Sequence, residues 1–154
     1  MGDWRRSTRE CTFDGLLPEL RQAITLYIDQ YNLGEILAES RMCVQTTSEQ
    51  VKKGLFGGGN IVVVGAIVTP RWLVWAIRAD RDEPSVMSAR LADVVVQDYA
   101  RTKFAQMVPD TGIEVSGSFT NVPERGSAFI GLGDETEAEQ FRQTVLDAVQ
   151  AAKK

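Results

Sequence analysis

Residues Asn60–Ala79 read NIVVVGAIVTPRWLVWAIRA and contain two strongly apolar runs. Val, Ile and Trp dominate both runs, and these side chains fit the pleated surface of a β-sheet better than they fit a helix. Pro70 has no backbone N–H, so we expect it in a turn at Thr69-Pro70-Arg71 and not inside a hydrogen-bonded ladder. The stretch therefore predicts two antiparallel strands joined at that turn.

The second predicted strand is apolar on both of its faces. Because side chains alternate along a strand, Trp72, Val74 and Ala76 point one way. Leu73, Trp75 and Ile77 then point the other way. An antiparallel sheet can leave one face in water, but here both faces need a cover. We expect both tryptophans to serve packing, one on each face.

Two amphipathic segments supply candidate covers. The range 17–34 predicts an N-terminal helix that begins at Pro18 and carries an apolar stripe from Leu20 to Tyr31. The range 134–152 predicts a C-terminal helix, with Asp134 as its N-cap and Glu137 in a capping-box position. We expect the first helix to pack on its own domain and not on a partner.

Between these helices, residues 40–132 show the pattern of short strands separated by turns. The remaining predicted strands cover 40–53, 86–91, 94–99, 113–119 and 127–132, and 101–112 is predicted as loop or irregular strand. Residues 1–16 are polar without a period and predict a flexible arm. The chain is then one α+β domain over 17–154: a bent antiparallel sheet or partly open barrel of about seven strands, capped by the C-terminal helix.

This succession of strands and one terminal helix resembles the pleckstrin-homology-like superfold, in its bacterial and GRAM-type branch. The residues that carry the likeness are Val68–Trp75 at the second-to-third strand passage, Leu91–Val96, and Phe129–Leu132 before the helix. The resemblance implies a bent sheet plugged at its open end by the helix. It also implies recruitment of a partner, without catalysis.

The amino-acid composition argues against several kinds of partner and reaction. A net charge of −4 gives no basic field for nucleic acid, so no nucleic-acid partner is expected. The chain has no histidine, which removes the commonest general base and most zinc sites, so we predict no enzyme activity, no metal and no cofactor. Cys11 and Cys43 are expected as reduced thiols with no joint role, and the expected compartment is the cytoplasm.

Two polar segments are candidate sites. Lys52 and Lys53 precede Leu55 and Phe56 in a glycine-rich loop, which predicts weak contact with an anionic membrane. Asp80, Asp82 and Glu83 cluster beside arginines and are expected to form a solvated turn, the alternative being a metal or acid–base site.

Three functions remain open from the sequence. The favoured one is a non-enzymatic binding or scaffold module that recruits a protein partner or associates with another copy of itself. The first alternative is peripheral membrane binding through Lys52–Phe56. The second is a small-ligand carrier or enzyme that uses the interior of the sheet, which would require a cavity lined by convergent polar groups.

Overall fold

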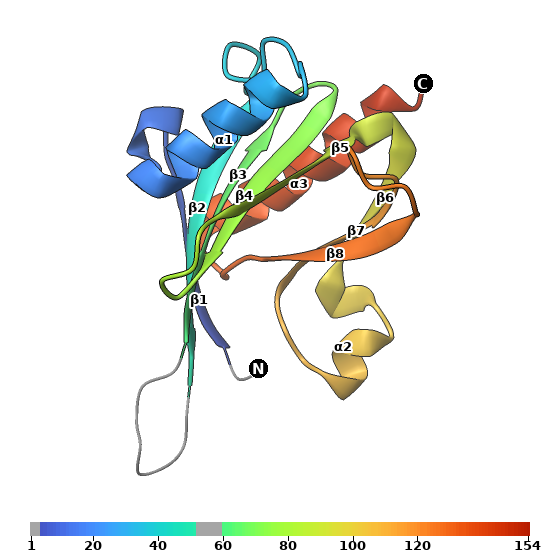
Figure 1. Ribbon diagram of the computed structural model, residues 1–154. Coiled ribbons are helices and arrows are strands. Elements are labelled where there is room, and N and C mark those ends of the chain that lie inside the picture. The colour runs from blue at the N-terminus through green and yellow to red at the C-terminus, as the bar shows by residue number, and fades with distance from the viewer. Residues whose placement is uncertain (1–3, 52–59) are drawn as a thin grey trace.

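The computed structural model describes residues 4–51 and 60–154, which form eight strands and three α-helices (Figure 1). The strands are β1 (Trp4–Glu10), β2 (Met42–Gln50), β3 (Ile61–Val68), β4 (Trp72–Ala79), β5 (Ser85–Arg90), β6 (Val94–Asp98), β7 (Gly112–Gly117) and β8 (Gly126–Gly131). The α-helices are α1 (Pro18–Gln30), α2 (Phe104–Met107) and α3 (Thr136–Ala152). Short 3-10 turns lie at Phe13–Gly15, Leu91–Asp93 and Tyr99–Arg101.

The strands form two antiparallel sheets, so the α+β class is confirmed. One sheet has the order β1-β2-β3-β4-β5 and the other has the order β6-β7-β8. Across the described ranges, no ladder joins the two sheets, which differs from the expected single bent sheet of about seven strands. The 3-10 turn Leu91–Asp93 separates β5 from β6 and moves the chain from the first sheet to the second.

The predicted hairpin is present as β3 and β4, in antiparallel register from Val62 opposite Ala79 to Val68 opposite Leu73. Its turn is closed by Thr69, whose side-chain oxygen accepts hydrogen bonds from the backbone N–H groups of Arg71 and Trp72 at 3.2 and 2.9 Å. Pro70 lies in this turn, outside the ladder, where its missing N–H leaves no partner unpaired.

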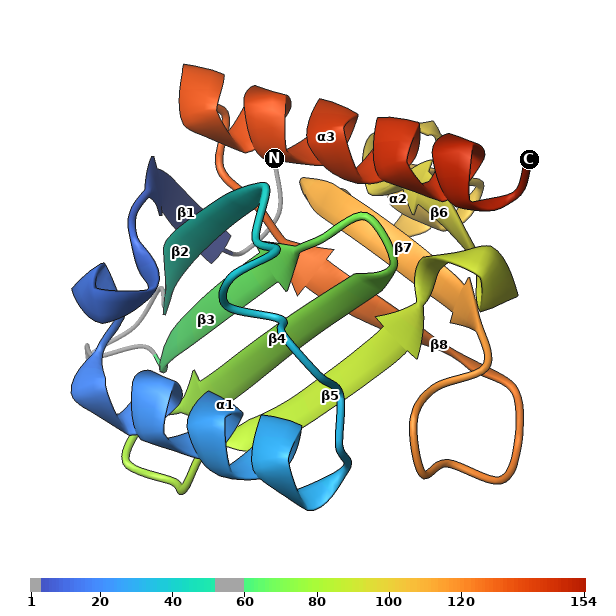
Figure 2. The ribbon, with the colours of Figure 1, turned by 90° about the horizontal axis from the view of Figure 1, so that it is seen from above.

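Both predicted covers are present, and Figure 2 shows the five-stranded sheet between α1 and α3. Leu20 and Ile24 of α1 pack with Ile67 and Val74 of the hairpin in one apolar core. A second core lies on the opposite side of the sheet, where α3 and the inner face of the three-stranded sheet meet it. This second core includes Leu73, Trp75, Ile113, Ile130, Phe141 and Val145. Trp72 packs against the first core and Trp75 lies in the second, as the alternation predicted.

The prediction of a flexible arm over 1–16 is wrong for Trp4–Glu10, which form strand β1. β1 pairs with β2 along its whole length, from Trp4 opposite Gln50 to Glu10 opposite Val44. Arg6 and Thr8 point inward, and their polar atoms are satisfied by side-chain hydrogen bonds. A strand whose inner face is polar gives no apolar alternation, so pairing with β2 determines its structure and local pattern does not.

Two boundaries also differ from expectation. Helix α3 begins at Thr136 with Glu135 as its N-cap, one residue beyond Asp134, and no side chain caps it. The carboxylate of Glu135 instead accepts a hydrogen bond from the backbone N–H of Thr8 at 3.1 Å, so tertiary pairing with β1 replaces the predicted capping box. Helix α1 ends at Gln30, before the left-handed residues Asn32 and Gly34.

Candidate binding surface

The loop predicted to contact membranes, with Lys52, Lys53, Leu55 and Phe56, lies outside the described residues. The strands that flank it are described. β2 ends and β3 begins at the lower end of the molecule in Figure 1, and α2 lies at the same end. Val51 and Ile61, the apolar residues on either side of this junction, are exposed.

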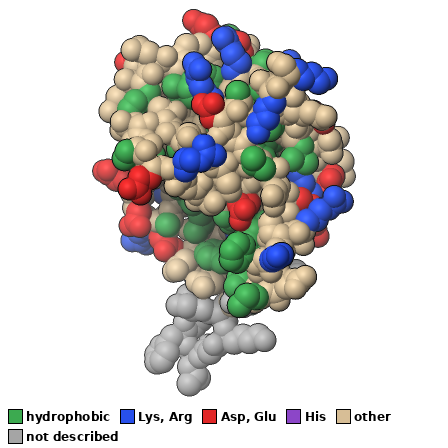
Figure 3. Space-filling view, turned by 90° about the vertical axis from the view of Figure 1, so that its right-hand side faces the viewer, with side chains coloured by type: hydrophobic (Ala, Val, Ile, Leu, Met, Phe, Trp, Pro, Cys, Tyr) green, Lys and Arg blue, Asp and Glu red, His purple; other side chains and the backbone are tan. Residues whose placement is uncertain are grey.

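Helix α2 and the residue that directly follows it carry three large apolar side chains that point into solvent. Phe104 is 65% exposed, Met107 83% and Val108 65%. We call these three residues the α2 surface. Figure 3 shows hydrophobic side chains gathered toward the lower end of the face that carries the second sheet. Large exposed apolar side chains that adjoin one another are informative, whereas single ones are ordinary.

The backbone of this segment is held in place although its apolar side chains face outward. The hydroxyl of Tyr99 donates to the carbonyl oxygen of Val108 at 2.9 Å, which ties the two ends of the segment together. The hydroxyl of Thr102 donates to the carbonyl oxygen of Tyr99 at 2.7 Å. The Tyr99 ring packs edge-on against Phe129 of β8, with centroids 5.0 Å apart. The α2 surface therefore belongs to an anchored element.

Charge beside the α2 surface is unbalanced. Arg101 and Lys103 are exposed and lie on the turn that leads into Phe104, and in the part of the chain that the structure describes neither forms an ion pair. The neighbouring acidic residues are already engaged. Asp98 lies 3.8 Å from Arg142, and Asp110 forms a close ion pair with Arg6. The segment thus presents two uncompensated cations next to apolar side chains.

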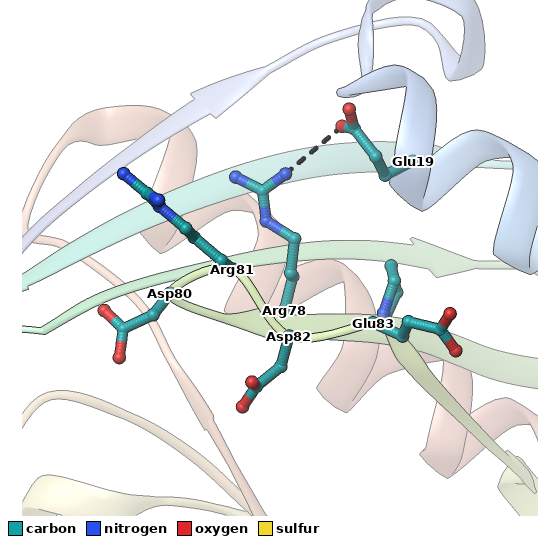
Figure 4. A pocket seen from close by; sticks show the side chains of 7 residues that line it. Glu19, Arg78, Asp80, Arg81, Asp82 and Glu83 are labelled. Atoms are coloured by element: carbon teal, nitrogen blue, oxygen red, sulfur yellow. Dashed lines mark ion pairs between the residues drawn. The ribbon is translucent and has the colours of Figure 1, made fainter.

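The acidic turn after β4 lines a shallow hollow of about 360 Å³ (Figure 4). Arg78 forms an ion pair with Glu19 of α1 at 3.3 Å. Asp80 accepts a hydrogen bond from the backbone N–H of Ile61 at 2.9 Å and so closes the end of the hairpin. In Figure 4 the side chains of Asp80, Asp82 and Glu83 point in different directions. Within 4–51 and 60–154, no three acidic or cysteine side chains form a group that could hold a metal ion.

The structure brings together two cysteines that were expected to have no joint role. Cys11 follows β1, and its backbone N–H donates to the carbonyl oxygen of Cys43 in β2 at 3.0 Å. Their sulfur atoms are 3.8 Å apart, and both cysteines are free thiols. Cys43 is buried in the core under α1, whereas Cys11 is partly exposed.

This contact shifts the pKa values of the two thiols in opposite directions. A hydrogen bond from Cys43 stabilises the Cys11 thiolate and lowers the pKa of Cys11 to about 7, and the nearby charge of Arg9 acts in the same direction. The same hydrogen bond, together with burial, raises the pKa of Cys43. Near neutral pH the thiol of the more exposed Cys11 is therefore partly ionised, whereas that of Cys43 stays protonated.

The sequence alone did not identify either the α2 surface or the cysteine pair. The segment Phe104–Val108 did contain a usable signal, because large apolar residues in a region predicted as loop have no core to face. The cysteine pair left no such signal, since residues 32 positions apart meet only through the register of β1 on β2.

No family model, curated protein or solved structure matches the chain. Of the helices in the described ranges, none has both the length and the apolar character needed to cross a membrane.

Proposed function

We propose that this protein is a non-catalytic docking module that attaches to anionic membrane surfaces through the α2 surface. The single observation that carries the proposal is the exposure of Phe104, Met107 and Val108 on an anchored turn next to Arg101 and Lys103. Exposed apolar side chains can enter the interface between headgroups and acyl chains, while adjacent cations meet anionic headgroups.

The size of the surface favours a membrane over a protein. A stable protein interface buries roughly 800 Å² on each partner and uses about 20–30 residues a side. The α2 surface is three side chains wide, which is small for the core of such an interface. Burial of each large apolar side chain contributes about 1.5–3 kcal/mol at most, and each cation near anionic lipid about 1 kcal/mol. These magnitudes support weak, reversible attachment.

Self-association has less support than membrane attachment. Helix α1 of the same chain covers one face of the hairpin, so that face is not available to a second copy. A protein partner remains a rival occupant of the α2 surface and is an outcome of the test below. The carrier alternative has less support, because residues between the two sheets pack against one another in a single apolar core.

The pleckstrin-homology-like assignment and the cytoplasmic location belong to the same proposal. The assignment is supported by the order of strands followed by α3, and the division of eight strands into two sheets departs from it. The net charge of −4 opposes anionic lipid at long range, so attachment has to depend on local charge and should weaken as salt is added.

The test is sedimentation with vesicles of phosphatidylcholine, with and without phosphatidylserine. We expect the full chain to sediment with the mixed vesicles at low salt and to sediment less as salt rises. Phe104→Ser with Met107→Ser should abolish sedimentation, and Arg101→Glu with Lys103→Glu should reduce it strongly. Leu26→Ser is the matched control, because Leu26 is 63% exposed but lies on α1.

Three results would refute membrane docking: no sedimentation of the wild-type chain, equal binding to neutral vesicles, or equal loss with Leu26→Ser. Sedimentation equilibrium gives a further criterion. A dimer that Phe104→Ser dissociates would make the α2 surface a contact between copies of the chain. A protein partner displaced by the same variant, without vesicle binding, would assign the surface to that partner.

A further inference from the structure

We propose that Cys11 and Cys43 form a hydroperoxide-reactive modification site, in which Cys11 is oxidised first and Cys43 then closes an intramolecular disulfide. The proposal rests on three observations: the short distance between the sulfurs, their unequal exposure, and the positive charge held beside Cys11. It is independent of the membrane proposal.

Distance and connectivity favour an intramolecular product. The sulfurs are 3.8 Å apart, and the backbones beside them are already joined by the hydrogen bond from Cys11 to Cys43. Cys11 and Cys43 continue the register that places Glu10 opposite Val44, so they face each other across the end of the β1–β2 ladder. Bond formation therefore requires rotation of the two side chains to reach disulfide geometry, without separation of the strands.

Exposure determines which sulfur reacts first. Cys11 lies at the end of β1 and is partly exposed, whereas Cys43 is 5% exposed and packs under α1. A peroxide from solvent can reach Cys11. The buried Cys43 sulfur lies within 3.8 Å of the Cys11 sulfur and can react with it next. A reactive cysteine beside a second thiol is the arrangement typical of redox-sensitive pairs.

Charge around Cys11 supports its thiolate form. The guanidinium of Arg9 donates a hydrogen bond to the carbonyl oxygen of Gly15 at 2.8 Å. Gly15 lies beside Cys11, since a Cβ added to this glycine would be 3.3 Å from the Cys11 Cβ. The charged groups that act on Cys11 are Arg9 and Glu10, with Cys43 as its titrating neighbour. Arg9 favours the thiolate and Glu10 opposes it.

The reaction balances without any group beyond the peroxide. The Cys11 thiolate attacks the O–O bond, which breaks and releases hydroxide or an alkoxide, and Cys11 becomes a sulfenic acid. The Cys43 thiol then attacks the Cys11 sulfur, its proton joins the departing hydroxyl, and water leaves. Two thiols and one hydroperoxide thus give one disulfide, one alcohol or water, and one further water.

The test uses the reduced full chain treated with hydrogen peroxide, followed by iodoacetamide and measurement of intact mass. We expect a monomer that has lost two hydrogens and that no longer reacts with iodoacetamide. Cys43→Ala should stop at the sulfenic acid, which dimedone captures on Cys11. Cys11→Ala should resist the same peroxide dose. If Cys43→Ala fails to fold, dimedone added to the wild-type chain at early times should label Cys11 in peptide maps.

Removal of the Arg9 charge tests whether the Cys11 thiolate is activated, and not merely close to Cys43. Arg9→Gln should slow oxidation at pH 7 by about twofold and move the pH midpoint of the rate upward, because the thiolate loses a nearby cation. Arg5→Gln is the control on the same strand and should leave the rate unchanged. The proposal is overturned if dimedone labels Cys43 first, if the disulfide joins two chains, or if both thiols survive a dose that oxidises free cysteine.

Discussion

Arg6 and Asp110, which are 104 positions apart, form a two-bond ion pair that ties the N-terminal strand to the segment between α2 and β7. Arg6 donates from Nε and Nη2 to the two carboxylate oxygens of Asp110 at 2.8 and 2.7 Å, and from Nη1 to the Ser48 hydroxyl at 2.6 Å. Trp4 and Phe129 lie on the guanidinium, each ring centroid 5.3 Å from Cζ. The pair links β1 of the five-stranded sheet to the segment that leads into β7 of the three-stranded sheet, and among the described strands no ladder joins the two sheets.

Removal of the Asp110 carboxylate should destabilise the fold strongly. The side chains of Arg6 and Asp110 are only 10% and 16% exposed, so Asp110→Ala leaves a desolvated guanidinium without its counter-charge. We expect a loss of about 3 kcal/mol in the free energy of unfolding, measured by urea titration. Glu39→Ala is the control, because the Glu39–Arg71 pair is exposed and should contribute less than about 1 kcal/mol. Equal effects of the two variants would show that the Arg6–Asp110 pair contributes no more to stability than an exposed ion pair does.

The same pair explains why β1 was missed from sequence. Hydrophobic alternation identified the hairpin, because Val, Ile and Trp there face two apolar cores. In β1 the inward positions are Arg6 and Thr8, whose partners come from distant parts of the chain: Asp110, Ser48 and Thr46. The local sequence pattern does not reveal such distant partners. A strand with a polar inner face is therefore predicted from sequence as a flexible arm.

The α2 surface and the cysteine pair were harder to predict from sequence than the fold, because both depend on contacts between distant parts of the chain. The hairpin and both covering helices follow from periodicity, which is a local property of the sequence. The α2 surface is identified by exposure, and exposure depends on which apolar residues the other elements leave uncovered. The contact of Cys11 with Cys43 depends on strand register. Both are properties of the assembled tertiary structure.

The core under α1 gives a direct test of the two-cover argument. Ile24 is fully buried against the hairpin, so Ile24→Ala removes apolar contacts and leaves a cavity. We expect a loss of about 2–5 kcal/mol in the free energy of unfolding. Leu26→Ala changes an exposed position on the same helix and should cost less than about 0.5 kcal/mol. If Ile24→Ala were equally mild, α1 would not be a structural cover of the sheet.

Two glycines with positive φ should differ in their tolerance of alanine. Gly117 has a φ of +146°, and a Cβ there would collide with the carbonyl oxygen of Asp93 and with the backbone of Val94. Gly34 has a φ of +81° and open space around the corresponding position. Gly34→Ala should therefore cost about 1–2 kcal/mol from backbone strain alone, and Gly117→Ala should cost more. Thermal melts of both variants check the order, and the reverse order would contradict the described backbone at β7.

The reduced cysteine pair should make stability depend on pH. The pKa of Cys11 is lowered in the folded chain to about 7 from an ordinary value of 9.0. Between these two values the unfolded chain binds more protons than the folded chain, so stability should rise as pH increases from about 7 to 9. Above that range the raised pKa of Cys43 reverses the sign, because the unfolded thiol ionises and the buried thiol does not.

This pH dependence is measured as the difference in urea midpoint between the reduced wild-type chain and Cys11→Ser. The difference should move in favour of wild type from pH 7 to 9 and then level off, because Cys43 is buried and resists ionisation in both chains. Cys11→Ser retains a polar side chain of similar size and has no acidic proton in this range, so other titrating groups cancel. A difference that is flat across the range would show that the Cys43 thiol does not donate to the Cys11 thiolate.

Oxidation of the same pair should stabilise the chain. A bond between Cys11 and Cys43 closes a loop that contains α1, and a loop closed by cysteines 32 positions apart lowers the entropy of the unfolded chain by the equivalent of about 3–4 kcal/mol at 25 °C in the chain-entropy model. We expect the oxidised chain to unfold at a higher urea concentration than the reduced chain, with the difference removed by dithiothreitol and absent in Cys43→Ala. Because the strands are already hydrogen-bonded beside these residues, little native strain should offset the gain. An oxidised chain that unfolds more easily than the reduced one would mean that the 3.8 Å contact cannot close without distortion of the β1–β2 ladder.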